Sequence, residues 1–447
     1  MVMRIGLLGR GVGDAAYLAE QGANVLVVDD APQEVMQPSV DALASYENIA
    51  FRFSPYQFAD FKDADMVLVG AGAPWDEPVL VECREAGIPL KQSAALFAEL
   101  SKIPIIGVTG TRGKSTVTEL IHHVLTVVTG ESIIKGGNIR GVSNLQLLKD
   151  VKPESLAVME LDSWQLQGWG WAGISPQIAV FTSFMPDHLN YYQRGDVSYE
   201  AAMARYLGDK AEIFRHQEES GVLITTPTVL EEIRTRLSGI EYGGELLLAD
   251  ASVLPEDMLL ALPGEHNRLN AALAYEALKA VSLTDEEIFE AMASFPGLEG
   301  RLQLVTTIDH VRIYNDNNAT TPAATIAALE ALDLGNRNIV LIAGGADKQL
   351  DPAPLLPALA AHVKGLILLP GTGTDRLTAL LREAEAAPCP WQEVASIEEA
   401  VAAARSQTAN ADIILFSPGF ASFGLFKNEY ERNDAFLQVV QALEAEG

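Results

Sequence analysis

Cysteine and basic residues are both scarce in this chain of 447 residues, which contains only two cysteines, Cys83 and Cys389. Two cysteines far apart in sequence exclude a disulfide scaffold and a cysteine-rich metal site, and they suit a reducing cytoplasm. Lys and Arg number 31 against 60 Asp and Glu, which gives a formal net charge of −29. Nucleic acid is therefore not expected as a partner, because binding many phosphates needs a basic face.

Long apolar runs are also missing. No segment offers the roughly 20 uninterrupted apolar residues of a membrane span, and the N-terminal residues 1–9 lack the build of a signal peptide. We therefore expect a cytoplasmic protein without membrane insertion, and we predict a monomer. The length and the hydrophobic content of 48% suit about three globular domains.

A glycine-rich segment stands out between residues 103 and 118, where a buried strand, a turn and the start of a helix are expected. This order is typical of a phosphate-binding loop, because glycines let backbone N–H groups converge on phosphate and the helix N-terminus is positive. Val108 stands where the commonest form of the loop has a further glycine. We expect Lys114 to neutralise the β- and γ-phosphates and Ser115 or Thr116 to bind Mg²⁺. The predicted nucleotide contacts are Gly110, Thr111, Arg112, Gly113, Lys114, Ser115 and Thr116.

The N-terminal residues 4–30 predict a βαβ unit, with a strand over 4–8, a turn over 9–14, a helix to Gln21 and a second strand over 24–28. The turn resembles a dinucleotide-binding fingerprint, but Asp14 stands where its third glycine belongs. Because one chain rarely needs both NAD and a phosphate loop, we favour a nucleotide-sugar diphosphate over NAD as the ligand of this domain. A second loop, 70–74, follows strand 66–69 at the same edge of the sheet, where ligands bind in such folds.

The form Gly-x-Thr-Gly-Thr-x-Gly-Lys-Ser over 107–115 resembles the phosphate loop of the Mur ligases and of their relative folylpolyglutamate synthase, ATP-dependent enzymes that join an amino acid to a carboxylate. Further matches follow in family order over essentially the whole chain: Gly-Gly-Asn at 136–138, Glu-Leu-Asp-Ser-Trp-Gln-Leu at 160–166, Asp-His at 187–188, Lys-x-x-Ile-Phe at 210–214, His-Asn at 266–267, a linker arginine at 301 and Asn-Asp at 315–316. The elements Ser422 and Phe-Lys-Asn at 426–428 are most similar to the family member that adds D-glutamate to UDP-N-acetylmuramoyl-L-alanine.

The resemblance implies ATP and two Mg²⁺ ions, with the metal ligands Ser115, Glu160, His188 and Lys210. A glutamate at a strand end beside a phosphate loop suits Mg²⁺ on its chemistry alone, while Asp162 would more simply be a solvated strand-end acid. From the residues alone Lys210 would be a helix-surface lysine paired with acidic neighbours. In the family the matching lysine is carbamylated by CO₂, so a carbamylated Lys210 is implied, and this requires a desolvated, neutral amine.

The resemblance also assigns the substrates. ATP would phosphorylate the alanyl carboxylate, and the amine of glutamate would attack the acyl phosphate, with Asp316 or His188 assisting deprotonation. Asn267, Asn270 and Arg301 are implied as further ATP contacts, although the two asparagines could simply cap a helix. Catalytic roles fall on Lys114, His188, Lys210 and Asp316. The UDP-substrate contacts are Gly11, Val12, Gly13, Asp29, Gly72 and Asn138, and the amino-acid contacts are Thr320, Lys348 and Ser422.

The expected architecture is α/β in three domains: a Rossmann-like UDP-sugar-binding domain over 1–95, a central P-loop ATPase-like domain over 96–300 and a Rossmann-like amino-acid-binding domain over 301–447. Asn318 stands where the family has a lysine, which leaves open a relative that adds another amino acid, including L-glutamate. A homologue that binds nucleotide without turnover is an alternative from a second class. An NAD-dependent oxidoreductase is a third class.

Overall fold

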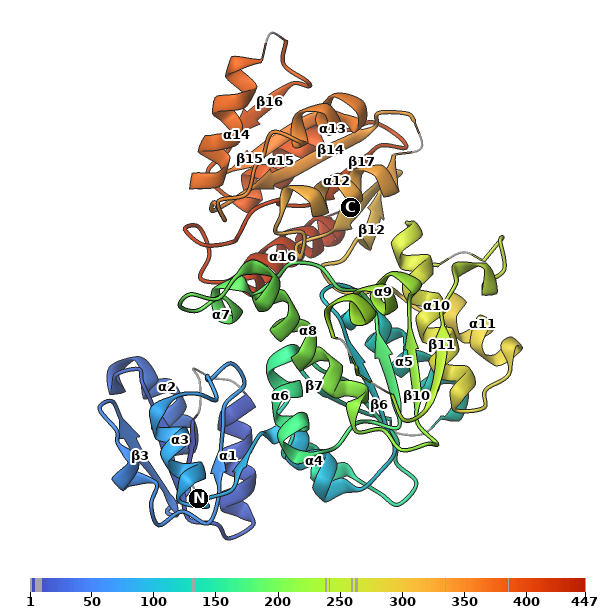
Figure 1. The fold of residues 1–447 in the computed structure, drawn as a ribbon. Helices are drawn as coiled ribbons and strands as arrows, with labels where there is room; N and C mark the ends of the chain where they lie inside the picture. Colours follow the sequence, from blue (N-terminus) through green and yellow to red (C-terminus); the bar gives the residue numbers. More distant parts are fainter. Residues whose placement is uncertain are drawn as a thin grey trace. The chain divides into compact units, whose positions relative to one another are not determined.

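The chain forms two compact units in the computed structural model (Figure 1). The first unit comprises Met1–Glu256 and Leu269–Met292, and the second comprises Asp257–Arg268 and Ala293–Gly447. In the described part of the chain, no helix is long and apolar enough to cross a membrane. The structure describes residues 2–4, 10–130, 133–237, 239–240, 242–258, 260–261, 264–333, 335–384 and 386–446.

The N-terminal part of the first unit is a parallel sheet with the strand order β3-β2-β1-β4-β5. Helices cover both faces of this sheet, because Val27 packs with α1 and α2 on one face and Val28 packs with α3 on the other. Its strands are β1 (Val2–Arg4), β2 (Val25–Asp29), β3 (Ile49–Phe53), β4 (Val67–Leu68) and β5 (Leu90–Lys91), and its helices are α1 (Arg10–Glu20), α2 (Gln33–Leu43), η1 (Phe58–Asp60) and α3 (Pro78–Glu85).

Helix α1 begins at Arg10, earlier than the predicted end of the turn at Asp14. The predicted ligand-binding residues Gly11, Val12 and Gly13 therefore lie in the first turn of the helix, and the expected turn over 9–14 is wrong in this respect. The first backbone N–H groups of a helix have no acceptor within the helix, so this position still offers donors to a ligand. Most of the predicted strand over 4–8 falls on residues 5–9, outside the described residues.

The central sheet is wholly parallel, with the order β11-β10-β9-β6-β8-β7. β6 lies between β8 and β9, so Thr109, Glu160 and Phe181 reach the same edge of the sheet. Its strands are β6 (Ile105–Thr109), β7 (Ile134–Gly137), β8 (Ala157–Glu160), β9 (Ile178–Phe181), β10 (Val222–Thr225) and β11 (Glu245–Leu248). The helices along this stretch are α4 (Ser93–Ser101), α5 (Lys114–Thr129), η2 (Gln146–Asp150), α6 (Ser163–Ala172), α7 (Leu189–Tyr192), α8 (Tyr199–Arg215), α9 (Pro227–Arg236), η3 (Ala251–Val253), α10 (Glu265–Ala280) and α11 (Asp285–Ala293).

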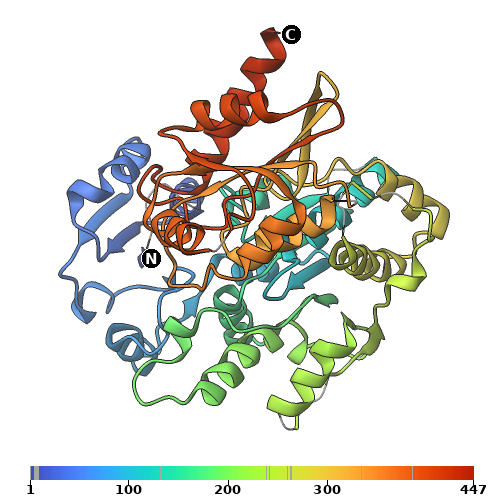
Figure 2. The same cartoon turned by 90° about the horizontal axis from the view of Figure 1, so that it is seen from above.

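The third sheet, in the second unit, has the order β12-β13-β17-β14-β15-β16 and is parallel except for the β12–β13 pair. Helices α12, α13 and α14 pack on one face, and α15 and α16 pack on the other; α16 is the red helix that ends at C in Figure 2. The strands are β12 (Gln303–Ile308), β13 (Val311–Asn315), β14 (Ile339–Gly344), β15 (Val363–Leu369), β16 (Trp391–Glu393) and β17 (Ile413–Phe416). The helices are α12 (Pro322–Leu332), α13 (Leu355–His362), α14 (Thr372–Glu383), α15 (Ile397–Gln407) and α16 (Glu429–Glu446).

Three helix-covered sheets confirm the predicted α/β class. Among the described strands, each strand end that the sequence placed beside a polar loop lies at the carboxyl edge of its sheet, where parallel α/β folds bind ligands. The domain boundaries at 95/96 and 300/301 stay predictions.

Candidate active site

The glycine-rich loop between β6 and α5 can only be built with glycine at two positions. Gly110 has φ +148°, and a Cβ there would lie 2.0 Å from Thr182 Oγ1. Gly113 has φ +86°, and a Cβ there would lie 2.5 Å from Asn270 Oδ1. Left-handed backbone and close packing together exclude larger residues, and they leave a backbone cradle at the N-terminus of α5.

The segment after β9 holds this loop in place. Thr111 N donates to Ser183 O at 2.8 Å, and Arg112 N donates to Ser183 Oγ at 2.8 Å. Lys114 Nζ donates to Gly110 O at 3.0 Å and to Thr111 O at 3.3 Å. The lysine thus folds back over the loop, and its charge lies where the loop would receive phosphates.

Lys210 is the most unusual member of the site. It lies in α8 and is only 2% exposed, so its interpretation as a helix-surface lysine is wrong. Its Nζ donates to Gly110 O at 2.9 Å and lies 4.9 Å from the centre of the Tyr206 ring. Burial, and then the charge of Lys114, lower the pKa of Lys210 well below its usual value, against the opposite effect of nearby acids.

Glu160 ends β8 beside the loop and is buried. Asn138 N donates to Glu160 O at 2.6 Å, and Asn138 Nδ2 lies 3.5 Å from Glu160 Oε1. Asp162, two residues further on, caps α6 instead, because its Oδ1 accepts from Gln165 N at 2.8 Å. This contact accounts for Asp162 without a metal.

His188 lies in left-handed backbone at φ +53°, and its ring centre is 4.7 Å from that of Trp164 and 5.9 Å from that of Tyr206. Burial lowers the pKa of His188, and the charges of Lys210 and Lys114 add to this, while Asp187 acts in the opposite direction. A neutral imidazole is the form that can bind a metal ion or accept a proton.

The donor set suits an ion that arrives with a nucleotide. In the described ranges, no three His, Cys, Asp or Glu side chains gather closely enough to hold a metal ion alone. Mg²⁺ is usually held by one or two carboxylates together with phosphate and water oxygens. Glu160 beside a phosphate-binding cradle fits that pattern.

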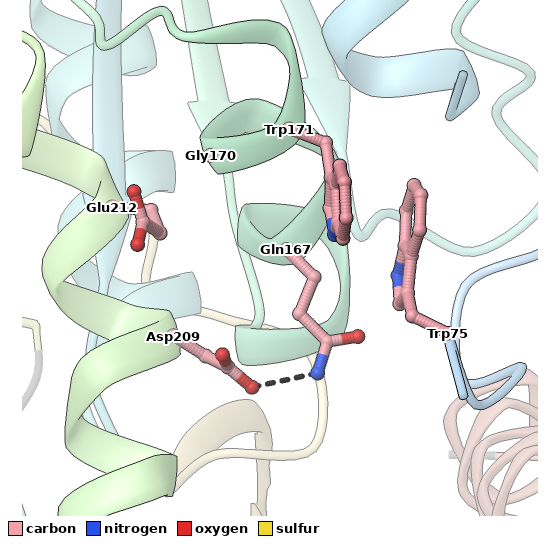
Figure 3. A pocket seen from close by; sticks show the side chains of 6 residues that line it. All are labelled: Trp75, Gln167, Gly170, Trp171, Asp209 and Glu212. Carbon is pink, nitrogen blue, oxygen red and sulfur yellow. Dashed lines mark hydrogen bonds between the residues drawn. The ribbon is translucent and has the colours of Figure 1, made fainter. Parts of the chain in front are cut away.

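A separate hollow of about 460 Å³ in the first unit contains none of the predicted residues (Figure 3). Trp75 and Trp171 stack there at 5.2 Å, and Gln167 Nε2 donates to Asp209 Oδ2 at 2.6 Å. Burial raises the pKa of Asp209 to about 6. Together with Glu212, this carboxylate makes the hollow unfavourable for phosphate, so the loop before α5 is the better candidate site.

In the second unit, the linker before β12 is tied to the loop that follows β13. Asp316 is buried and accepts from Leu302 N at 3.1 Å and from Ser417 Oγ at 2.8 Å. Burial raises the pKa of Asp316 to about 7. Asn318, where the family has lysine, donates its N–H to Gly300 O at 2.9 Å. These contacts flank Arg301 on both sides and place its backbone.

The predicted amino-acid contacts also come together. Lys348 Nζ donates to Thr320 Oγ1 at 2.8 Å. Ala346 and Ala421 exchange backbone hydrogen bonds of 2.8 and 3.0 Å, which brings the loop with Ser422 beside the loop with Lys348. Two hydroxyl groups and an ammonium group at one sheet edge can bind a carboxylate.

Sequence reasoning missed Arg432, which is only 1% exposed at the start of α16. Its guanidinium donates to Asn317 Oδ1, Asn317 O and Phe420 O at 2.8, 3.0 and 3.0 Å. Burial lowers its pKa to about 10. Arg432 thereby fastens the Asp316 loop to the segment before Ser422. The only sequence signal was an arginine among acidic residues, four positions after Asn428.

The remaining predicted residues are distributed over both units. Asp29 is buried and its Oδ1 accepts from Ala31 N at 3.0 Å. Gly72 has φ +88° and faces the Trp164 ring, 3.9 Å from the position of a Cβ. Asn267 and Asn270 both lie in α10, but Asn267 belongs to the second unit and Asn270 to the first.

A phosphate-binding loop at the carboxyl edge of a parallel sheet, with two lysines and a buried glutamate around it, defines an α/β protein built to bind a nucleotide. Comparison with known proteins narrows the class. Residues 108–240 match the Mur ligase middle domain, and residues 300–420 match the family model described as Mur ligase, glutamate ligase domain.

Two relatives that match over nearly the whole chain carry the same name. The UDP-N-acetylmuramoylalanine--D-glutamate ligase of Roseiflexus sp. (strain RS-1) is 35% identical, over 99% of this chain and 98% of the relative. The enzyme of the same name from Symbiobacterium thermophilum is 32% identical, over 98% of each chain. The solved structure of the MurF ligase of Thermotoga maritima in complex with ADP has the same fold, with a TM-score of 0.60 and 16% identity over 95% of this chain and 96% of that one. The chain belongs to the Mur ligase family, as its motifs predicted.

Proposed function

We propose that this protein is an ATP-dependent ligase that adds D-glutamate to UDP-N-acetylmuramoyl-L-alanine in peptidoglycan precursor synthesis, and that it works in the cytoplasm as a monomer. The observation that carries the reaction type is the buried Lys210 against the phosphate loop, beside Glu160. The choice of substrates rests on the name shared by the relatives from Roseiflexus sp. and Symbiobacterium thermophilum. The domain boundaries given above belong to the same proposal.

ATP binds along the loop from Gly110 to Thr116 in this proposal. Lys114 exchanges its two carbonyl acceptors for the β- and γ-phosphates, which costs little because the ammonium group already lies over the loop. Two Mg²⁺ ions would neutralise the phosphate charge, held by Ser115, Glu160, His188 and carbamylated Lys210. Arg301, Asn267 and Asn270 complete the nucleotide contacts.

Lys210 is suited to carbamylation because burial lowers the pKa of its amine, which makes the neutral form easier to reach. The ammonium group first loses one proton to water. The lone pair of the neutral nitrogen then attacks the carbon of CO₂, the N–C bond forms as one C=O π bond opens, and a second proton leaves to water, so that a cation becomes an anionic oxygen ligand. Removing the buried positive charge also relieves its repulsion with Lys114. A mass increase equal to one CO₂ on the peptide that carries Lys210 would support this step.

The reaction then has two transfers. The alanyl carboxylate attacks the γ-phosphorus of ATP, and ADP leaves; the amine of glutamate attacks the acyl carbon, phosphate leaves and an amide remains. Asp316, with its pKa of about 7, or His188 takes the proton of the amine near neutral pH.

The proposed substrate contacts fall on the two outer sheets, except Asn138, which follows β7 of the central sheet. We assign the UDP part of the acceptor to Gly11, Val12 and Gly13 in the first turn of α1, with Asp29, Gly72 and Asn138. We assign the glutamate carboxylates to Thr320, Lys348 and Ser422. The hydrogen bond of 2.8 Å between Lys348 and Thr320 supports this assignment, because the two side chains lie close enough to contact the same carboxylate.

The test is phosphate release by the purified protein with Mg²⁺, ATP and UDP-N-acetylmuramoyl-L-alanine, with each amino acid added separately and the product mass recorded. Release with D-glutamate alone, together with a gain of one glutamyl unit, is expected. Phosphate release with L-glutamate or another amino acid would show that D-glutamate is the wrong amino-acid substrate. No release with any amino acid would overturn the proposal that the protein is an enzyme.

A further inference from the structure

Asp14 stands where a dinucleotide-binding fingerprint has its third glycine. In the structure, its side chain accepts hydrogen bonds from a distant segment of the chain, residues 143–145. It is only 3% exposed, although it lies in the first turns of α1. Its Oδ1 accepts from Ser143 Oγ at 2.6 Å and from Leu145 N at 3.1 Å. Hydrogen bonds to a buried carboxylate are short and strong. Without them, the buried carboxylate of Asp14 would have neither water nor protein donors around it, so these contacts are costly to break.

The packing around Asp14 supports the same connection. A Cβ on Gly13 would lie 2.5 Å from Ser143 Cβ, so glycine is needed here for close approach. Gln146 Nε2 donates to Gly13 O at 3.1 Å. Leu145 is fully buried in the core of the N-terminal sheet, together with Ala15. The segment 143–146 is thus docked on α1 by polar and apolar contacts at once.

The same segment reaches Glu160 on its other side. Asn144 Oδ1 accepts from Gly137 N at 2.7 Å. Gly137 has φ +88°, and a Cβ there would lie 2.0 Å from Glu160 O, so the backbones are in close contact. Asn138, the next residue, donates its N–H to Glu160 O at 2.6 Å. Hydrogen bonds joined by single peptide bonds between neighbouring residues therefore connect Asp14 with the strand end that carries Glu160.

We propose that Asp14 is a positioning residue that holds Asn138 and Glu160 in register with the first turn of α1; the consequence for catalysis rests on the function proposed above. The first turn of α1 is the proposed site for the UDP part of the acceptor, and Glu160 is the proposed metal ligand. Their relative position decides whether the acceptor carboxylate meets the γ-phosphate, because in-line transfer tolerates little misplacement. In this proposal, Asp14 connects the part of the site that binds the UDP group with the part that binds the metal ion.

The direct test measures amide hydrogen exchange at single residues in Asp14→Ala and in the more conservative Asp14→Asn. We expect the amides of Leu145, Gly137 and Asn138 to exchange roughly tenfold faster or more in Asp14→Ala, the size expected for losing hydrogen bonds to a charged group, and less so in Asp14→Asn. Asp41→Asn, an exposed acid on α2 of the same sheet, is the matched control and should leave all three unchanged.

Faster exchange at Leu145 alone, with Gly137 and Asn138 at the wild-type rate, would overturn the proposal, because Asp14 would then hold only its neighbour. If Asp14→Ala does not fold, Asp14→Asn and Ser143→Ala decide the question with the same three amides. This readout needs no substrate, so it is independent of the proposed function.

A second measurement addresses catalysis. In Asp14→Asn the Mg²⁺ concentration for half-maximal phosphate release should rise about 3–10-fold, somewhat less than the effect of removing a direct outer-shell partner of a metal ligand. Simple loss of folded protein would lower the maximal rate without moving this concentration, and that result would overturn the link to the metal site. If the wild type itself releases no phosphate, the proposed function fails while the exchange data still test the connection.

Discussion

Replacing Asp316 by Asn should remove part of the pH dependence of stability of the second unit. Burial raises the pKa of this carboxyl from an ordinary 3.8 to about 7, although Ser417, the Leu302 amide and Arg301 act in the opposite direction. The folded protein therefore holds this proton more tightly than the unfolded chain does. The protonated carboxyl therefore stabilises the fold. This contribution is complete below the pKa of Asp316 in the unfolded chain, and it is lost as the pH rises through its pKa in the folded protein.

The magnitude follows from the distance between the two pKa values. Each pH unit between them changes the free energy of unfolding by about 1.4 kcal/mol, so a rise from about pH 5 to about pH 8 should cost the wild type roughly 2–3 kcal/mol. Asn cannot lose a proton, and its amide can accept from Leu302 N and donate to Ser417 Oγ. The advantage of the variant over the wild type should therefore grow by that amount between the two pH values.

Hydrogen exchange of the slowest amides in β14 and β17 measures this opening free energy, after correction for the intrinsic effect of pH. Asp434→Asn, an exposed acid on α16, is the control for removal of one negative charge. If the opening free energies of Asp316→Asn and wild type differ by the same amount at both pH values, the reasoning is refuted. The carboxyl would then titrate alike in the folded and the unfolded chain.

Three further changes test the candidate site directly. Gly110→Ala places a Cβ against Thr182 in a backbone conformation that alanine rarely adopts. It should cost about 1–3 kcal/mol of loop stability and raise the KM for ATP at least tenfold. Gly130→Ala, where a Cβ would meet open space, should leave this KM unchanged. Lys210→Gln removes the carbamylation site and should lower kcat by about 10²-fold or more with nucleotide binding retained, as measured by ADP titration without metal; an unchanged kcat would exclude the proposed metal ligand. Asn318→Lys restores the cation of the family and should lower the KM for glutamate about threefold at low salt, an effect that should shrink in high salt if it is electrostatic.

Much of this protein could be predicted from local chemistry. The spacing of Gly110, Gly113 and Lys114 between an apolar strand and a helix specifies a phosphate loop, because those residue types are required within one turn of chain. The strand that ends at Glu160 and the alternation of strands and helices indicate the α/β class in the same way. These signals are contained within short segments, so they do not depend on what the rest of the chain does.

The tertiary structure decided the environment of single side chains. Lys210 looks like a surface lysine in sequence, yet α8 turns it into the core against Gly110, and that burial is the main cause of its lowered pKa. Arg432 lies 115 residues from its partner Asn317, and Asp14 lies 129 residues from Ser143. A hydrogen bond between such distant residues depends on how sheets and helices pack, and desolvation depends on everything that surrounds a group. Local sequence determines which chemical groups are available, and long-range packing determines which of them meet and in which protonation state.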